Sequence, residues 1–398
     1  MRIETLEAVE GFSQLAEEYD ELHMRSSACE NPCSRHEWLY SWWLAYGNGH
    51  RLHILTCRDD TGRLVGVLPG YITRTGVPMT RRFRLLADEH VGSTGLGPIA
   101  DSSVGDAASD ALAAHLCATT GQWDVADLRF LGSKSTFFLN GTRVPEGGSK
   151  RVRLDTGVTP VIALADDFER QLTEGISKRV RAHIRRVRRR TEEHGARFEL
   201  VTGGDALPAA LVDSKRLFED RMHQVVGRFF RVTPQFAQFA KRMSSVLAEQ
   251  GRLRIAFLTI GEERVAFAYL FRLGTTMHAV QCGFAEDWGW LNVFRALVSR
   301  VIEVAIDEGC TCLNFGLGDQ AYKYEWGHVE SECFSDVRVY TDSFAARAAR
   351  LRDGFMDGAL DAVLAAPKPV RESLLRTARH AKALLSRTKA AQNPKPKG

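Results

Sequence analysis

The sequence contains no apolar run of the ~18 to 20 residues that a membrane-spanning helix requires. Residues 1–10 include several acids and lack the basic start and apolar core of a secretory signal peptide. Cysteine is scarce, and the eight cysteines form none of the C-x-x-C pairs that zinc and redox sites use. These absences predict a cytoplasmic protein with buried free thiols and no bound metal.

A strong excess of either charge is also missing, because the net charge is only +4. The positive charge is local instead: residues 178–190 (KRVRAHIRRVRRR) contain eight Lys or Arg and no acid. The chain after Thr341 has twelve Lys or Arg against five Asp or Glu. A mild overall charge does not predict nucleic-acid binding, whereas two local basic segments predict anionic ligands or surfaces.

With 398 residues, the chain is longer than one compact core supports, so we expect two domains or a duplicated unit. The first clear element is a helix over residues 35–46. The spacing from Ser34 to Glu37 predicts a capping box at its start. Trp38, Trp42 and Ala45 then share one face, and an aromatic stripe of this kind is typical of a core.

Two strand hairpins recur at an offset of 201 residues, since Leu52, Ile54 and Arg63 correspond to Leu253, Ile255 and Arg264. The second hairpin is followed by a strand, a helix over residues 293–308 that begins after Asn292, and a strand over residues 311–315. Strands that alternate with helices in this way predict a mixed α/β fold.

The expected divisions are residues 1–145, 146–342 and 343–398, with a linker over residues 141–150. The last division is predicted to be a basic helical tail. Residues 371–389 are expected to form a helix there, with these apolar residues on one side: Leu374, Leu375, Ala378, Ala381, Leu384 and Leu385. This face either packs on the protein itself or docks on an anionic membrane or a partner.

The segment from Phe315 to Gly327 is the strongest candidate for a site. Gly316 and Gly318 follow a strand and would let a ligand approach backbone amides closely. If the next turn is helical, Asp319, Tyr322, Lys323 and Trp326 share a face at the edge where open α/β sheets bind ligands. The alternative is an Asp319–Lys323 ion pair with the two aromatic residues in the core.

This segment resembles the BioF2-like and CelD (BcsL)-like branch of the GNAT superfamily, which is related to the Fem-type aminoacyltransferases. The shared features are a glycine pair after a strand, an aromatic-Lys-x-x-aromatic signature, the Trp38–Trp43 helix, the basic helix after Ser177 and the sequence Cys282-Gly283-Phe284. The resemblance implies two tandem GNAT-like (acyl-CoA N-acyltransferase) domains that share a cleft. It also implies an acyltransferase.

The resemblance implies acyl-CoA, such as acetyl-CoA, as the donor, and no metal. The usual phosphate loop, however, is replaced by residues 287–293, where Gly289 and the amides after Asn292 are left to hold a phosphate. Gly316 and Gly318 complete the expected cofactor contacts. In the basic helix, Arg181, Arg185 and Arg186 lie opposite a packing stripe and could bind a substrate phosphate. A solvated helix face is the alternative.

The expected reaction is acyl transfer to an amine or hydroxyl of a small-molecule or sugar-linked acceptor, in polysaccharide or cell-envelope biosynthesis. Asp319 is the first candidate base and Glu325 the second. Lys323 would hold a phosphate or an oxyanion, and Tyr322 would protonate the leaving group. Two alternatives stay open: an aminoacyl-tRNA-dependent transferase, with tRNA as the partner, and a non-catalytic scaffold in polysaccharide assembly. The oligomeric state is not predicted.

Overall fold

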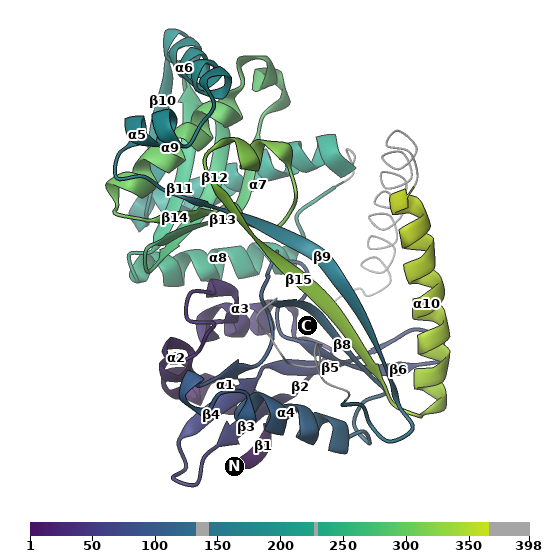
Figure 1. The fold of residues 1–398 in the computed structure, drawn as a ribbon. Helices are drawn as coiled ribbons and strands as arrows, with labels where there is room; N and C mark the ends of the chain where they lie inside the picture. Colours follow the sequence, from purple (N-terminus) through teal and green to yellow (C-terminus); the bar gives the residue numbers. More distant parts are fainter. Residues whose placement is uncertain (133–142, 227–229, 366–398) are drawn as a thin grey trace, which may run out of the picture.

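The computed structural model describes residues 1–132, 143–226 and 230–365 (Figure 1). The first half of the chain contains these elements: β1 (Arg2–Leu6), α1 (Val9–Gln14), α2 (Ala16–Met24), α3 (His36–Tyr46), β2 (Arg51–Leu52), β3 (Ile54–Arg58), β4 (Leu64–Leu68), β5 (Gly70–Thr75), β6 (Thr80–Leu85), β7 (Ile99–Ala100), α4 (Ala107–Ala118) and β8 (Val125–Gly132).

The second half and the last helix contain these elements: β9 (Ser149–Ala163), α5 (Phe168–Glu174), α6 (Lys178–Glu193), β10 (Ala196–Val201), α7 (Leu207–Val226), α8 (Pro234–Glu249), β11 (Leu253–Ile260), β12 (Glu263–Leu273), β13 (Thr276–Phe284), α9 (Val293–Asp307), β14 (Cys312–Asn314), β15 (Val329–Tyr340) and α10 (Phe344–Ala365). Short 3-10 helices cover Glu286–Leu291 (η4) and Ala321–Glu325 (η5).

One sheet runs through both halves. It has eleven strands in the order β10-β11-β12-β13-β14-β9-β15-β8-β6-β5-β2, and a second sheet has the order β1-β3-β4-β7. The long strands β9 and β15 pair with each other and cross diagonally from one half to the other in Figure 1. Because β15 also pairs with β8, this ribbon joins the two halves.

The two halves repeat one order of connections. In the first, β3 and β4 form an antiparallel hairpin, and α4 connects β6 to its parallel partner β8. In the second, β11 and β12 form the hairpin, and α9 connects β13 to its parallel partner β14. The repeat and the mixed α/β fold that the sequence predicted are therefore confirmed.

The hydrophobic core forms two clusters on opposite faces of the sheet, because successive side chains of a strand point to opposite faces. Ile255 and Phe257 belong to a cluster that includes α7 and α8, whereas Ala256 and Leu258 pack with α6 and α9. The first cluster continues into α3, where the Trp38 ring lies 5.0 Å from that of Phe239. The predicted aromatic core of α3 is confirmed, and it also joins the halves.

Two local predictions in the first half are wrong. Ser34 does not cap α3, because its hydroxyl bonds the Asn31 carbonyl, and Glu37 accepts instead from Arg35. The second strand of the first hairpin, expected over residues 63–73, is not continuous, because Pro69 separates β4 from β5 and the two strands enter different sheets. Proline has no amide hydrogen for a ladder, so a strand ends there.

The C-terminal division begins with α10, which lies along the first-half part of the sheet in Figure 1. Its described residues include three arginines and three aspartates, so this helix is not basic. The helix predicted over residues 371–389 lies outside the described residues. Of the linker predicted over residues 141–150, residues 143–148 are described and belong to no helix or strand, and β9 begins at Ser149. Among the helices that the structure describes, none is long and apolar enough to cross a bilayer.

Candidate functional site

The candidate site lies where β13 and β14 separate. The two strands pair in parallel only from Thr276 to His278 with Cys312 to Asn314. After Asn314 the chain leaves β13 and continues along β9, with which β14 also pairs, since the Phe315 amide donates to the Pro160 carbonyl at 3.0 Å. Opposite β12, the register of β13 shifts at Val280, which adds a bulge to the free part of the strand. We call the space between the two diverging strands the opening, and the segment after β14 lies in it.

That segment is a loop held together by Lys323. The Lys323 Nζ donates to the carbonyls of Gly316, Leu317 and Gly318 at 2.8, 3.0 and 3.1 Å. The side chain is buried, and burial lowers the pKa of this ammonium to about 8. An ammonium has three hydrogens, so none is left for a phosphate or an oxyanion. Lys323 is therefore a positioning residue for the loop.

Gly316 is required by the shape of this loop. Its φ is +67°, and a Cβ would lie 2.5 Å from the Ala279 carbonyl oxygen of β13. Gly318 also has a positive φ, of +113°. Both glycines therefore allow the backbone conformation that brings three carbonyls to the Lys323 ammonium.

The predicted helical face over residues 319–326 is wrong. Only Ala321–Glu325 is helical, as a short 3-10 turn, and Asp319 precedes it. Asp319 is exposed, and its Oδ1 accepts a hydrogen bond from the Tyr324 hydroxyl at 2.5 Å. Glu325 pairs with Arg295 of α9 at 2.6 Å. Of the two candidate bases, Asp319 is therefore the one whose charge is not neutralised by an arginine.

Tyr322 points into the opening, toward the thiol of Cys282 on β13. Its ring meets the edge of Phe294 at 5.3 Å between centroids and that of Phe315 at 6.3 Å. Burial first, and then the Cys282 thiol, raise the pKa of Tyr322 well above its usual value. The phenol stays protonated at neutral pH and can only give a proton to a neighbouring group.

Cys282 and Arg221 are parts of this site for which no role was predicted. Burial raises the pKa of the Cys282 thiol, and the charges of Lys323 and Arg221 oppose that shift. The Arg221 guanidinium comes from α7 and lies 5.3 Å from the Phe284 ring centre. Cys282 belonged to the resembling motif, whereas nothing in the spacing of α7 indicated Arg221.

The predicted phosphate contacts lie at the start of α9. Gly289 belongs to η4, and Asn292 follows with a left-handed φ of +57°. In the described part of the chain, the Asn292 side chain caps none of the first amides of α9. Because Phe294 of this first turn touches Tyr322, the start of α9 and the phenol face the same opening.

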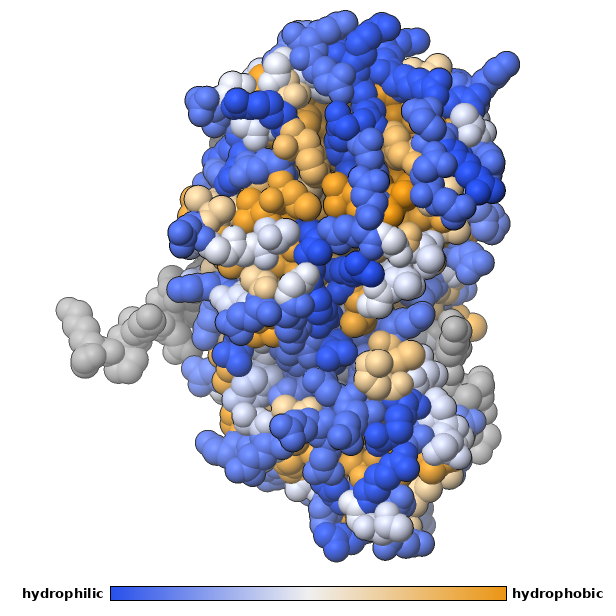
Figure 2. Space-filling view, turned by 90° about the vertical axis from the view of Figure 1, so that its left-hand side faces the viewer, coloured by the Kyte–Doolittle hydropathy of each residue, from blue (hydrophilic) through white to orange (hydrophobic). Residues whose placement is uncertain are grey.

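The basic helix α6 has the predicted packing stripe, since Ile184, Val187 and Thr191 are buried. Its arginines differ in their partners. Arg181 donates to the Thr173 carbonyl at 3.2 Å, and Arg185 pairs with Glu169 at 2.5 Å, whereas Arg186 is exposed. Figure 2 shows a hydrophilic top to the molecule, where α6 lies.

Arg186 is also the one of the three whose charge acts, together with that of Arg295 of α9, on His183. Burial and then the charges of Arg295 and Arg186 lower the pKa of His183, one helical turn earlier. Of the three predicted phosphate ligands, Arg186 is therefore the one that combines an exposed guanidinium with a position near Arg295 of α9.

A surface hollow of about 490 Å³ beside α6 does not coincide with the site. It is lined by residues of both charges: Asp167, Phe168, Glu169, Leu172, Arg185, Arg188, Arg189, Glu192 and Glu303. No group of three or more His, Cys, Asp or Glu that could hold a metal occurs among the described residues.

Residues 178–324 match the family model described as an acetyltransferase (GNAT) domain. This range contains α6, the diverging strands, the start of α9 and the Lys323 loop. No curated protein sequence matches the chain.

Several solved structures have a similar fold over most of their length. FemX matches with a TM-score of 0.59 and 11% identity, over 88% of this chain and 99% of FemX. A conserved protein of unknown function from Bacteroides thetaiotaomicron matches with a TM-score of 0.52 and 11% identity, over 85% and 100% of the two chains. L-PGS from Bacillus licheniformis matches with a TM-score of 0.50 and 12% identity, over 84% and 93%. These matches concern the fold of both halves together.

Proposed function

We propose that the protein is an acyltransferase that moves an acyl group from acyl-CoA to an amine or hydroxyl, and that the reaction takes place where β13 and β14 separate. The observation that carries the proposal is the position of Tyr322 in this opening, where its ring meets Phe294 at the start of α9, within the range that matches a GNAT acetyltransferase domain. Membership of the BioF2-like and CelD-like branch is part of the same proposal.

The acceptor nitrogen or oxygen attacks the thioester carbonyl, and a tetrahedral intermediate forms. Asp319 takes the proton that the acceptor loses, because its carboxylate is exposed and free of an arginine partner. The carbon–sulfur bond then breaks, and the Tyr322 hydroxyl gives its proton to the leaving thiolate. Lys323 acts on this reaction only through the loop that it holds.

The donor phosphates would lie at the start of α9. Its first amides carry the positive end of the helix dipole, and Arg186 adds an exposed guanidinium on the same side. Gly289 gives the backbone of η4 room for a close approach. No glycine-rich phosphate loop precedes Asn292, so we expect weaker phosphate binding than such a loop provides.

The proposal is tested by incubating the protein with acetyl-CoA and longer acyl-CoAs and a panel of amines and sugar-linked acceptors, while free thiol is measured. We expect release of thiol that depends on the acceptor and stops when the acceptor is omitted. Thermal shift with each acyl-CoA measures binding separately, because a ligand of the folded state raises the melting temperature. Neither thiol release nor a shift with any acyl-CoA would contradict the proposal.

An aminoacyl-tRNA donor is the second candidate, and the replaced phosphate loop favours it. The exposed arginines of α6 would then contact RNA phosphates, with binding that weakens steeply as salt rises. Salt-sensitive binding of charged tRNA together with no response to acyl-CoA would select this candidate. If neither donor binds, a scaffold in polysaccharide assembly is favoured.

A further inference from the structure

The charged residues of α10 are distributed in the reverse of the usual pattern for a surface helix. A helix on a protein surface normally turns apolar side chains inward and charges outward. In α10 the buried positions are Ala346, Ala349, Asp353 and Asp357, which recur at helical spacing. Two of these four are carboxylates, so this helix is held to the sheet by charge.

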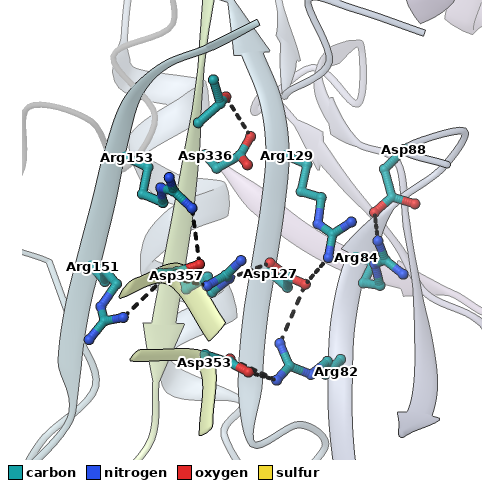
Figure 3. A network of polar contacts seen from close by, with 12 residues as sticks. Arg82, Arg84, Asp88, Asp127, Arg129, Arg151, Arg153, Asp336, Asp353 and Asp357 are labelled. Carbon is teal, nitrogen blue, oxygen red and sulfur yellow. Dashed lines mark hydrogen bonds and ion pairs between the residues drawn. The ribbon is translucent and has the colours of Figure 1, made fainter. Parts of the chain in front are cut away.

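The sheet beneath α10 provides the arginines that pair with these acids (Figure 3). Arg82 of β6 donates to both Asp353 oxygens at 2.8 and 2.9 Å. Asp357 accepts from Arg151 of β9 at 3.1 Å and from Arg338 of β15 at 2.8 Å. All the acids of the described helix are engaged in this way, since Asp361 accepts from Arg153 at 2.6 Å.

The outer side of α10 is apolar. Phe344, Leu351 and Phe355 lie seven and four residues apart, so they share the face opposite the buried aspartates. Their side chains are between 77% and 80% exposed. We call these three residues the outer stripe. Three large apolar side chains on one exposed helix face are unusual for a surface that contacts only water.

Cations flank the outer stripe. Arg347 and Arg350 lie to one side of it, and both are exposed. Arg347 also pairs with Asp342, just before the helix, at 2.6 Å. Arg352 lies to the other side, 3.5 Å from Asp353. The turn between β5 and β6 lies beside Arg352, because a side chain on Gly76 would collide with that guanidinium. Val77 and Met79 of this turn are also exposed, at 94% and 64%. The surface therefore combines apolar side chains with arginines, while Asp353 and Asp357 are buried against the sheet.

We propose that the outer stripe of α10 and the β5–β6 turn dock on an anionic lipid surface. A helix with an apolar face between basic flanks binds the boundary of a bilayer through apolar burial and attraction to anionic headgroups. The charge pattern favours lipid over the chain's own residues 371–389, because that segment is basic and would meet the arginines of α10 with like charge. A second copy would bring the same arginines together.

The test is sedimentation of the full chain with vesicles of equal parts phosphatidylglycerol and phosphatidylcholine, compared with phosphatidylcholine alone. We expect binding to the anionic vesicles that weakens as salt rises. Leu351→Glu together with Phe355→Glu should reduce binding about tenfold or more, because it removes apolar contact and adds repulsion. Val212→Glu is the control, since Val212 is 68% exposed on α7 and far from the stripe in sequence and fold.

A variant that ends at residue 365 separates this surface from the rest of the C-terminal segment. Binding by this variant that still depends on Leu351 and Phe355 supports the proposal. The proposal is overturned if the shortened variant binds the vesicles and the full chain does not, since residues 366–398 would then cover the stripe. It is also overturned if removal of residues 366–398 abolishes vesicle binding while the Leu351→Glu and Phe355→Glu double variant still binds. A third contrary result is a double variant that binds vesicles as wild type does and differs only in being a monomer where wild type is a dimer.

Discussion

The two halves of the chain use their parallel strand pairs differently. In the first half, the pair β6–β8 carries Arg82 and Asp127 into an ionic network that α10 covers. In the second half, the pair β13–β14 separates, and one buried lysine gathers the carbonyls of a loop beside Tyr322. The parallel strand pair of the repeated fold is thus covered by charge pairs in the first half, whereas in the second half its strands separate around a loop.

Asp353→Asn should have the largest effect on stability. It leaves the Arg82 guanidinium buried without its main counter-charge, which should cost about 3 to 5 kcal/mol of unfolding free energy. Thermal melting measures this loss, and acyl transfer per folded molecule should not change. Asp361→Asn is the control, because Asp361 is exposed and its pair should contribute less than about 1 kcal/mol. Equal losses for the two variants would contradict the assigned role of the buried network.

Lys323→Met should loosen the loop of the second half. Three carbonyls lose their partner, so we expect about 1 to 3 kcal/mol of lost stability and faster amide exchange over residues 316–318. The KM for the donor should rise and kcat should fall, because the loop no longer positions Tyr322. A loss of kcat without a change in KM or in exchange would instead mean that Lys323 contacts the reacting atoms.

The pH dependence of Lys323 provides a test of the same contact. Its pKa is lowered by burial from 10.5 to about 8, so above pH 8 the folded protein loses a proton that the unfolded chain keeps. By linkage, the contribution of this group to stability rises between those two values and is smallest below pH 8. Comparing the unfolding free energy of wild type and Lys323→Met across this range isolates that contribution. A flat difference would show that the pKa is not lowered.

Arg186→Ala should have the smallest effect, confined to binding of the donor. Removing one exposed phosphate contact should raise KM about three- to tenfold while kcat stays unchanged. Arg185→Ala is the matched control, since the Arg185 guanidinium already pairs with Glu169. Equal changes in KM for the two variants would place the phosphates elsewhere on α6.

The spacing of apolar residues along the sequence predicted those helices whose position depends on burial of one face. The helix expected over residues 293–308 is α9, Val293–Asp307, because its apolar residues recur at helical spacing and pack on the sheet. The packing stripe of α6 and the aromatic core of α3 were found for the same reason. The strand expected over residues 63–73 is interrupted at Pro69, because proline has no amide hydrogen for the ladder, and this signal is present in the sequence.

The remaining features depend on contacts between distant residues. The spacing of Asp319 and Lys323 suggested a shared helical face, but the Lys323 side chain turns back to the glycine loop. In α10, periodicity alone could not show which face is buried, because the answer depends on Arg82 and Arg338 of the sheet. Tyr322 was predicted from a motif, yet its environment required Cys282, forty residues earlier.

The most direct test of the account is the rate of Tyr322→Phe with two donors, an acyl-CoA and an acyl thioester whose leaving thiol is strongly acidic. If Tyr322 protonates the leaving thiolate, kcat with acyl-CoA should fall about a hundredfold or more, while the acidic donor is used at nearly the wild-type rate. The melting temperature and KM should change little, and Tyr40→Phe in the first half should match wild type. Wild-type kcat with acyl-CoA, or an equal loss with both donors, would contradict the account.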